Sequence, residues 1–83
     1  MGRYSHQFIE TYSGPVAFGL TREIDEASLI VYLQKVSDDQ LMEVLRKRLT
    51  EEEILQLADM VSGLLRRYLT EQEYHRLFLR EER

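Results

Sequence analysis

Residues 49–74, LTEEEILQLADMVSGLLRRYLTEQEY, contain one complete amphipathic segment between two copies of the same helix-start pattern. Thr50 and Thr70 are each followed three positions later by a glutamate, Glu53 or Glu73, which is the spacing of a capping box. The threonine oxygen accepts a backbone N–H of the first turn, and the glutamate accepts the N–H of the threonine. This stretch therefore predicts a helix that begins after Thr50 and a second that begins after Thr70.

The same start pattern occurs upstream, with Asp25 and Ser37 as the capping residues. An apolar residue precedes each cap and another follows four positions after it, as in a hydrophobic staple. The four starts predict main helices over about 26–36, 38–48, 51–68 and 71–82. The predicted fold class is all-α, a small compact bundle of four main helices in a single domain over residues 1–83.

The predicted helix over 51–68 has apolar residues at alternating spacings of three and four, which place them on one face. This first stripe contains Ile54, Leu57, Val61, Leu64 and Tyr68, and a second stripe beside it contains Leu55, Ala58, Leu65 and Leu69. Two adjacent stripes indicate that the helix packs against more than one neighbour. Gly63 costs about 1 kcal/mol relative to alanine in mid-helix. A close helix crossing over Ser62 and Gly63 is one reason for a glycine there.

Residues 29–33, LIVYL, leave the secondary structure of their segment open. The run is apolar all round and includes the β-branched Ile30 and Val31, so that a short buried strand is one reading. The cap at Asp25 and the helix directly downstream favour a helix that is buried on more than one side.

Residues 1–20 differ from the rest of the chain. A short helix is predicted at about 6–12, ending before Gly14-Pro15 because proline cannot continue a helix and disfavours it at the preceding residue. The apolar residues 16–20 then form an extended connector. This N-terminal segment packs either on its own bundle or on a second subunit.

We expect a homodimer, since a chain of 83 residues buries little of its surface and has no cysteine for a stabilising disulfide. Two-fold dimers are the commonest oligomers. The candidate interface consists of Tyr4, Phe8, Ile9, Tyr12, Val16, Phe18 and Leu20, together with the first main helix.

Two basic clusters raise the alternative of a nucleic-acid-associated regulator. This alternative basic surface contains Arg46, Lys47, Arg48, Arg66 and Arg67. Each cluster lies in the last turn of a predicted helix, where cations complement the helix dipole, and the first turns are correspondingly acidic. A recognition helix that begins with carboxylates repels phosphates, and the net charge is −4. We therefore do not expect nucleic acid as a partner.

The sequence provides no pattern for catalysis, a cofactor or a metal. It has no cysteine nucleophile, no Gly-x-Ser-x-Gly turn and no phosphate-binding glycine loop. His6 and His75 each share a predicted helix face with a carboxylate, Glu10 or Glu71, which we interpret as surface pairs rather than metal sites. We therefore predict no enzymatic activity, no catalytic residues and no cofactor.

Targeting and membrane signals are also missing from the sequence pattern. The longest apolar run, residues 29–33, is far shorter than the roughly 20 residues that cross a bilayer. The expected protein is cytoplasmic and does not contact a membrane. The function predicted is that of a non-enzymatic protein–protein interaction module, a small adaptor or regulator.

Overall fold

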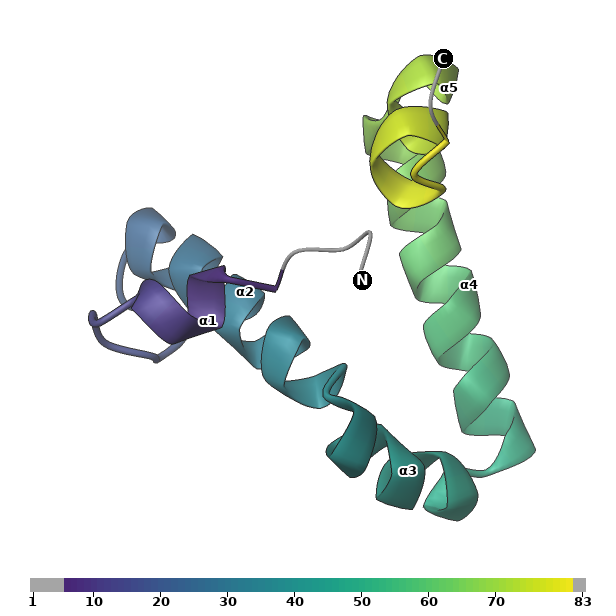
Figure 1. Cartoon of the computed structure of the whole chain (residues 1–83), viewed down its shortest axis with the longest axis horizontal. Coiled ribbons are helices and arrows are strands. Elements are labelled where there is room, and N and C mark those ends of the chain that lie inside the picture. The colour runs from purple at the N-terminus through teal and green to yellow at the C-terminus, as the bar shows by residue number, and fades with distance from the viewer. Residues whose placement is uncertain (1–5, 82–83) are drawn as a thin grey trace. The chain divides into compact units, whose positions relative to one another are not determined.

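The computed structural model describes residues 6–81 of the 83-residue chain, and these residues are 72% helical without a strand (Figure 1). The helices are α1 (Phe8–Thr11), α2 (Arg22–Val36), α3 (Asp39–Arg48), α4 (Glu51–Tyr68) and α5 (Glu71–Glu73), which continues as the π-helix η1 (Tyr74–Phe78). The predicted all-α fold with four main helices is confirmed. Residues 29–33 lie inside α2, so the helical reading of that segment is also confirmed.

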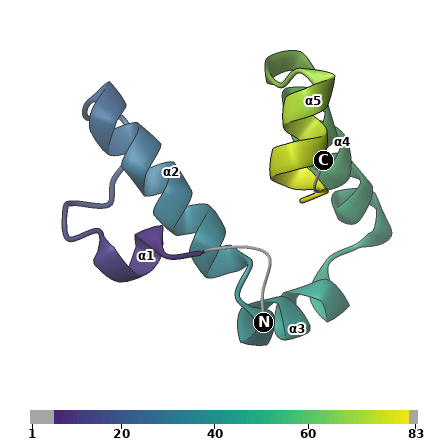
Figure 2. The same cartoon turned by 45° about the horizontal axis from the view of Figure 1, so that its top comes forward.

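The chain separates into two compact units at the junction between Arg48 and Leu49. In the N-terminal unit, α1 packs on α2 and α2 leads into α3; α1 lies beside α2 in both views (Figure 2). In the C-terminal unit, α5 and η1 follow α4 after a sharp turn at Leu69 and Thr70. The prediction of a single domain stays a prediction.

The start of α2 differs from the prediction. The cap is Thr21, whose side chain accepts the N–H of Ile24 at 3.1 Å, so the helix begins one turn before the predicted cap at Asp25. The Asp25 carboxylate instead accepts the backbone N–H of Gly19 at 2.8 Å and holds the preceding connector. The predicted cap at Asp25 is therefore wrong, because the Asp25 carboxylate binds the connector and Thr21 caps the helix.

The start of α3 is displaced by one residue. Asp38, rather than Ser37, accepts the first-turn N–H groups of Gln40 at 3.0 Å and Leu41 at 3.2 Å. Ser37 Oγ donates to the carbonyl of Gln34 in the last turn of α2 at 3.2 Å. The predicted cap at Ser37 is therefore wrong, because this hydroxyl serves the end of one helix and the following carboxylate serves the start of the next.

The starts of α4 and α5 agree with the prediction. Both Thr50 and Thr70 form the complete capping box with the glutamate three positions later. The last helix does not continue as an α-helix over 71–82, because the Leu79 N–H donates to the Tyr74 carbonyl five residues earlier, at 3.0 Å. Arg80 then adopts a left-handed conformation with φ of 59°, which ends the segment.

The N-terminal segment has a shorter helix than predicted. Helix α1 spans only Phe8–Thr11, and its start at Gln7 has no side-chain cap. Residues 16–20 form a connector without a helix, as predicted, but it bends at residues 18–20 instead of staying extended. The Ala17 N–H donates to Ser28 Oγ at 2.8 Å. Ser5, directly before the predicted start of this helix at about residue 6, lies outside the described residues.

Within the described part of the C-terminal unit, Gly63 is not a close crossing point. A Cβ atom built on Gly63 meets no atom within 4 Å. The glycine therefore leaves open space at this position of α4 rather than admitting a neighbouring backbone.

Candidate interaction surfaces

The N-terminal unit leaves most of the apolar side chains around α2 exposed. Val31 is 5% exposed and, with Ser28, is buried in this unit. Seven large apolar residues of the connector and α2 stay open to solvent, and Ile30, at 38%, is the least exposed of them. The rings of Phe18 and Tyr32 make an edge-to-face contact between connector and helix, with centroids 5.8 Å apart. We call the six that are more than half exposed the α2 surface: Val16, Phe18, Leu20, Leu29, Tyr32 and Leu33.

The residues of the candidate interface predicted from the sequence fall into a half-buried group and an exposed group. Phe8, Ile9 and Tyr12 are half-buried, because α1 packs on α2 of the same unit and the Ile9 N–H donates to Gln34 Oε1 at 2.9 Å. Val16, Phe18 and Leu20 remain exposed and belong to the α2 surface. Tyr4 lies outside the described residues. Part of the N-terminal segment thus packs on its own unit, and part is available to another chain.

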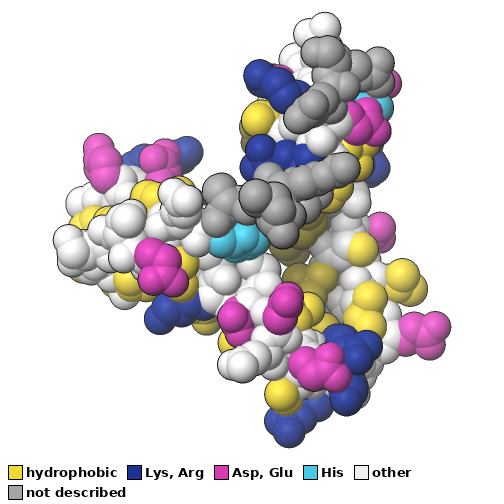
Figure 3. All heavy atoms as spheres, in the orientation of Figure 1, with side chains coloured by type: hydrophobic (Ala, Val, Ile, Leu, Met, Phe, Trp, Pro, Cys, Tyr) yellow, Lys and Arg dark blue, Asp and Glu magenta, His cyan; other side chains and the backbone are white. Residues whose placement is uncertain are grey.

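Helix α4 carries a second exposed apolar set, which coincides with the first stripe predicted from the sequence. We call it the α4 stripe: Ile54, Leu57, Val61, Leu64 and Tyr68. All five are between 45% and 70% exposed. Figure 3 shows hydrophobic side chains, in yellow, at intervals along α4 at the right of the picture. A helix this apolar on one side is typical of a helix that packs on another chain or unit.

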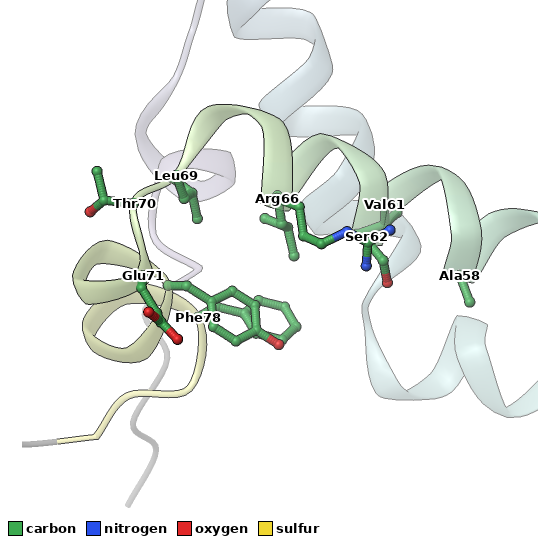
Figure 4. Close-up of a pocket in the computed structure, with 10 residues that line it drawn as sticks. Ala58, Val61, Ser62, Arg66, Leu69, Thr70, Glu71 and Phe78 are labelled. Atoms are coloured by element: carbon green, nitrogen blue, oxygen red, sulfur yellow. The ribbon is translucent and has the colours of Figure 1, made fainter.

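An apolar groove of about 730 Å³ lies inside the C-terminal unit, between α4 and the segment formed by α5 and η1 (Figure 4). Ala58 and Leu65 line it from α4, and Tyr74 and Phe78 line it from η1. The two aromatic rings stack with centroids 5.1 Å apart, one turn of the π-helix from each other. Sequence reasoning missed this groove, although the second stripe on α4 and the aromatic pair of η1 are its visible signals.

Two residues of opposite charge line the groove from its two sides. Arg66 from α4 and Glu71 from α5 both line it, and Figure 4 shows both side chains around the groove that Phe78 enters. Three residues of the predicted second stripe, Ala58, Leu65 and Leu69, therefore line this groove together with residues of α5 and η1. The α4 stripe borders the groove, and Val61 belongs to both.

The predicted basic surface is partly neutralised by an acidic neighbour. Glu43 accepts two hydrogen bonds from Arg46, both at 3.1 Å, and forms an ion pair with Lys47 at 3.0 Å. The hydrogen bonds of Arg46, and then of Lys47, lower the pKa of Glu43. Arg67 lies over the ring of Tyr68, at 5.7 Å from its centroid. Arg46, Lys47 and Arg48 belong to the N-terminal unit, whereas Arg66 and Arg67 belong to the C-terminal unit.

The two histidines do not form the pairs predicted from their spacing. His75 Nδ1 lies 2.7 Å from Glu81 Oε1 rather than pairing with Glu71, because the π-helix and the turn after it bring Glu81 back. His6 precedes α1, with φ of 56°, and its Nε2 lies 3.0 Å from Ser37 Oγ instead of facing Glu10 as a helical pair. Among residues 6–81, no three His, Cys, Asp or Glu side chains are placed to hold a metal ion.

Comparisons of this chain with protein-family models, with curated proteins and with solved structures find no match. Over residues 6–81, no helix combines the length and the apolar character that crossing a membrane requires.

Proposed function

We propose that this protein is a non-enzymatic protein–protein interaction module, a small adaptor or regulator that acts by presenting apolar helix surfaces to another protein chain. The observation that carries the proposal is the α2 surface. Its residues stay exposed around Val31, the one large apolar side chain that is buried among the described residues. Apolar groups gathered on a surface are favourable to bury, and they mark sites where proteins associate.

The roles of the polar residues support a binding module rather than an enzyme. Glu53 and Glu73 are engaged in capping boxes, and Glu43 is engaged by two cations. These carboxylates hold helix ends or form exposed ion pairs, whereas general acid–base catalysis requires a group aimed at a bound substrate. The groove in the C-terminal unit is lined mainly by apolar side chains.

The nucleic-acid alternative has weaker support. A phosphate-binding surface needs cations that are free to replace counterions. Arg46 and Lys47 share one carboxylate, Glu43, which reduces the positive potential at the end of α3. We therefore retain protein, rather than nucleic acid, as the class of partner, and a homodimer as the proposed state.

The test is an affinity pull-down from the native cell with three forms of the full chain. Phe18→Asp places a charge in the α2 surface, and Val44→Asp places the same charge at an exposed apolar residue of α3, outside that surface. Proteins identified by mass spectrometry that are retained by the wild type and by Val44→Asp, but lost with Phe18→Asp, support the proposal. Identical protein sets for all three forms contradict it.

A further inference from the structure

We propose that α4 pairs with α4 of a second copy of this chain, in antiparallel orientation, through the α4 stripe. This inference rests on the proposed function as an interaction module. It names the partner of one surface as a second copy, and it leaves the α2 surface for a different protein.

The spacing of the α4 stripe is that of a two-helix seam. Ile54, Val61 and Tyr68 are seven residues apart, and Leu57 and Leu64 fall three residues after the first two. This is the alternation of first and fourth heptad positions through which two helices interlock side chains. The helix is 18 residues long, so the stripe runs along most of its length.

The C-terminal unit reaches this stripe only at Val61, which also lines the groove and is still 49% exposed. The groove residues Ala58 and Leu65 face α5 and η1, and they lie on the next strip of the α4 surface. Leu57 and Leu64 are each 52% exposed, and Tyr68 is 70% exposed. A second helix can therefore approach the stripe from the side of α4 that faces away from the groove.

The charges of α4 indicate which chain binds the α4 stripe and whether the two helices run parallel or antiparallel. The first turn carries Glu51, Glu52 and Glu53, and the last turn carries Arg66 and Arg67. Two copies in antiparallel orientation place the acidic turn of each beside the basic turn of the other, and they also oppose the two helix dipoles. Parallel copies would place like charges together at both ends. The surface is thus complementary to itself, which argues for a second copy.

The heptad positions also fix the register of the pair. In an antiparallel pair, first heptad positions pack against fourth positions of the other helix, so Ile54 lies beside the partner's Leu64 and Leu57 lies beside the partner's Val61. On the flank away from the groove, Glu53 then faces the partner's Arg67. Met60, which is 65% exposed, lies on the same flank at the two-fold axis and faces the partner's Met60.

The register is tested by cross-linking, because the chain contains no cysteine. Single variants Met60→Cys and Ile54→Cys of the full chain are treated with a short bismaleimide. The proposal predicts a covalent dimer with Met60→Cys and none with Ile54→Cys, since the two copies of residue 54 are displaced by about 15 Å along the helix axis. A dimer with Ile54→Cys alone would indicate parallel helices, and no dimer with either variant would place the contact elsewhere. Both of these results overturn the proposal.

The stripe itself is tested by a matched pair of leucines in α4. Leu57 lies in the stripe and is 52% exposed, whereas Leu55 lies outside it and is 61% exposed. In sedimentation equilibrium, Leu57→Asp should raise the dimer dissociation constant by at least about thirty-fold, the effect of losing a central interface residue. Leu55→Asp should change it by less than about three-fold, with both variants keeping wild-type helicity by circular dichroism.

Different results would contradict the α4 pairing and the proposed interaction module. If Leu57→Asp and Leu55→Asp leave a dimer that Phe18→Asp dissociates, the α2 surface holds the two copies and the α4 pairing is wrong, while the interaction module stands. If the wild type is monomeric and Leu57→Asp unfolds it more than Leu55→Asp does, the chain's own N-terminal unit or its fold occupies the stripe. That result also overturns the pairing.

Discussion

Thr50 and Glu53 hold the start of α4 by exchanging hydrogen bonds. The Glu53 N–H donates to Thr50 Oγ1 at 3.1 Å, and the Thr50 N–H donates to Glu53 Oε1 at 2.9 Å. Thr70 and Glu73 repeat this exchange, with the same two distances, at the start of α5. Each pair satisfies two N–H groups that have no partner within a helix, so both starts are stabilised by contacts between residues three positions apart.

The first prediction concerns these caps. Thr50→Ala and Thr70→Ala should each lower the free energy of unfolding by about 1 kcal/mol, because the first turn loses its hydroxyl acceptor. The two effects should add in the double variant, since the caps share no residue. Chemical denaturation measures both. Thr11→Ala is the control, because that hydroxyl makes only long contacts of 3.4 Å, to the carbonyls of Gln7 and Phe8. Equal effects at positions 11 and 50 would contradict the capping role.

The caps also indicate how far the sequence predicts this fold. Thr50 and Thr70 could be predicted because all partners of a capping box lie within three residues. Asp25 could not, because its carboxylate binds the Gly19 N–H across a connector whose path the sequence does not specify. At Ser37 and Asp38, two adjacent residues are both good caps, and the choice depends on the hydrogen bond from Ser37 to the end of α2.

The second prediction concerns Gly63. Its substitution by alanine should raise the free energy of unfolding by about 1 kcal/mol, since alanine favours the helix and the added Cβ meets no atom within 4 Å. Gly19→Ala should have the opposite sign, because Gly19 has a φ of 93° that alanine adopts only with strain. Thermal and chemical denaturation of the two variants measure this difference. Destabilisation by Gly63→Ala would mean that another helix approaches α4 at this position.

The third prediction concerns the pH dependence of α3. Hydrogen bonds from Arg46 and Lys47 lower the pKa of Glu43 below its ordinary value of 4.5, so the charged carboxylate stabilises the folded state. A lowered pKa means that this stabilisation is present above about 4.5 and is lost as the pH falls through the pKa of the folded state. Glu43→Gln should therefore lower the free energy of unfolding near neutral pH. It should also make that free energy change less as the pH falls.

Denaturation followed from about pH 6 to about pH 3 measures that effect, over the range in which carboxylates titrate. Asp59→Asn in the middle of α4 is the control, because it removes a carboxylate that is not part of this cluster. If Glu43→Gln lost stability at low pH to the same extent as the wild type, the stabilising role of the charged Glu43 would be contradicted. High salt should reduce the difference between Glu43→Gln and the wild type, since the ion pairs are exposed.

The fourth prediction concerns nucleic acid. Random DNA and RNA oligonucleotides should bind weakly or not at all near physiological salt, because the net charge is −4 and Glu43 pairs with Arg46 and Lys47. Fluorescence anisotropy over a salt series measures this. Tight binding with a steep salt slope, abolished by Arg46→Glu and Arg66→Glu, would favour the nucleic-acid alternative instead.

The two interaction surfaces were predictable to different degrees. The spacing of Ile54, Leu57 and Leu64 predicts one face of α4, and the structure leaves that face exposed. The groove beside Phe78 was not predictable, because it depends on a π-helix that no residue type in 74–78 specifies. The division of residues 8–20 also needed the structure, since only the packing of α1 on α2 separates half-buried from exposed side chains.

We propose that this chain associates with a second copy of itself through exposed apolar helices. Sedimentation equilibrium of the unmodified full chain, over a concentration range from low to high micromolar, measures whether it does. The mass should rise to twice the 9.9 kDa of one chain and then stay there, because a two-fold pairing closes on itself. A mass that remains at that of a single chain over the whole range would contradict it.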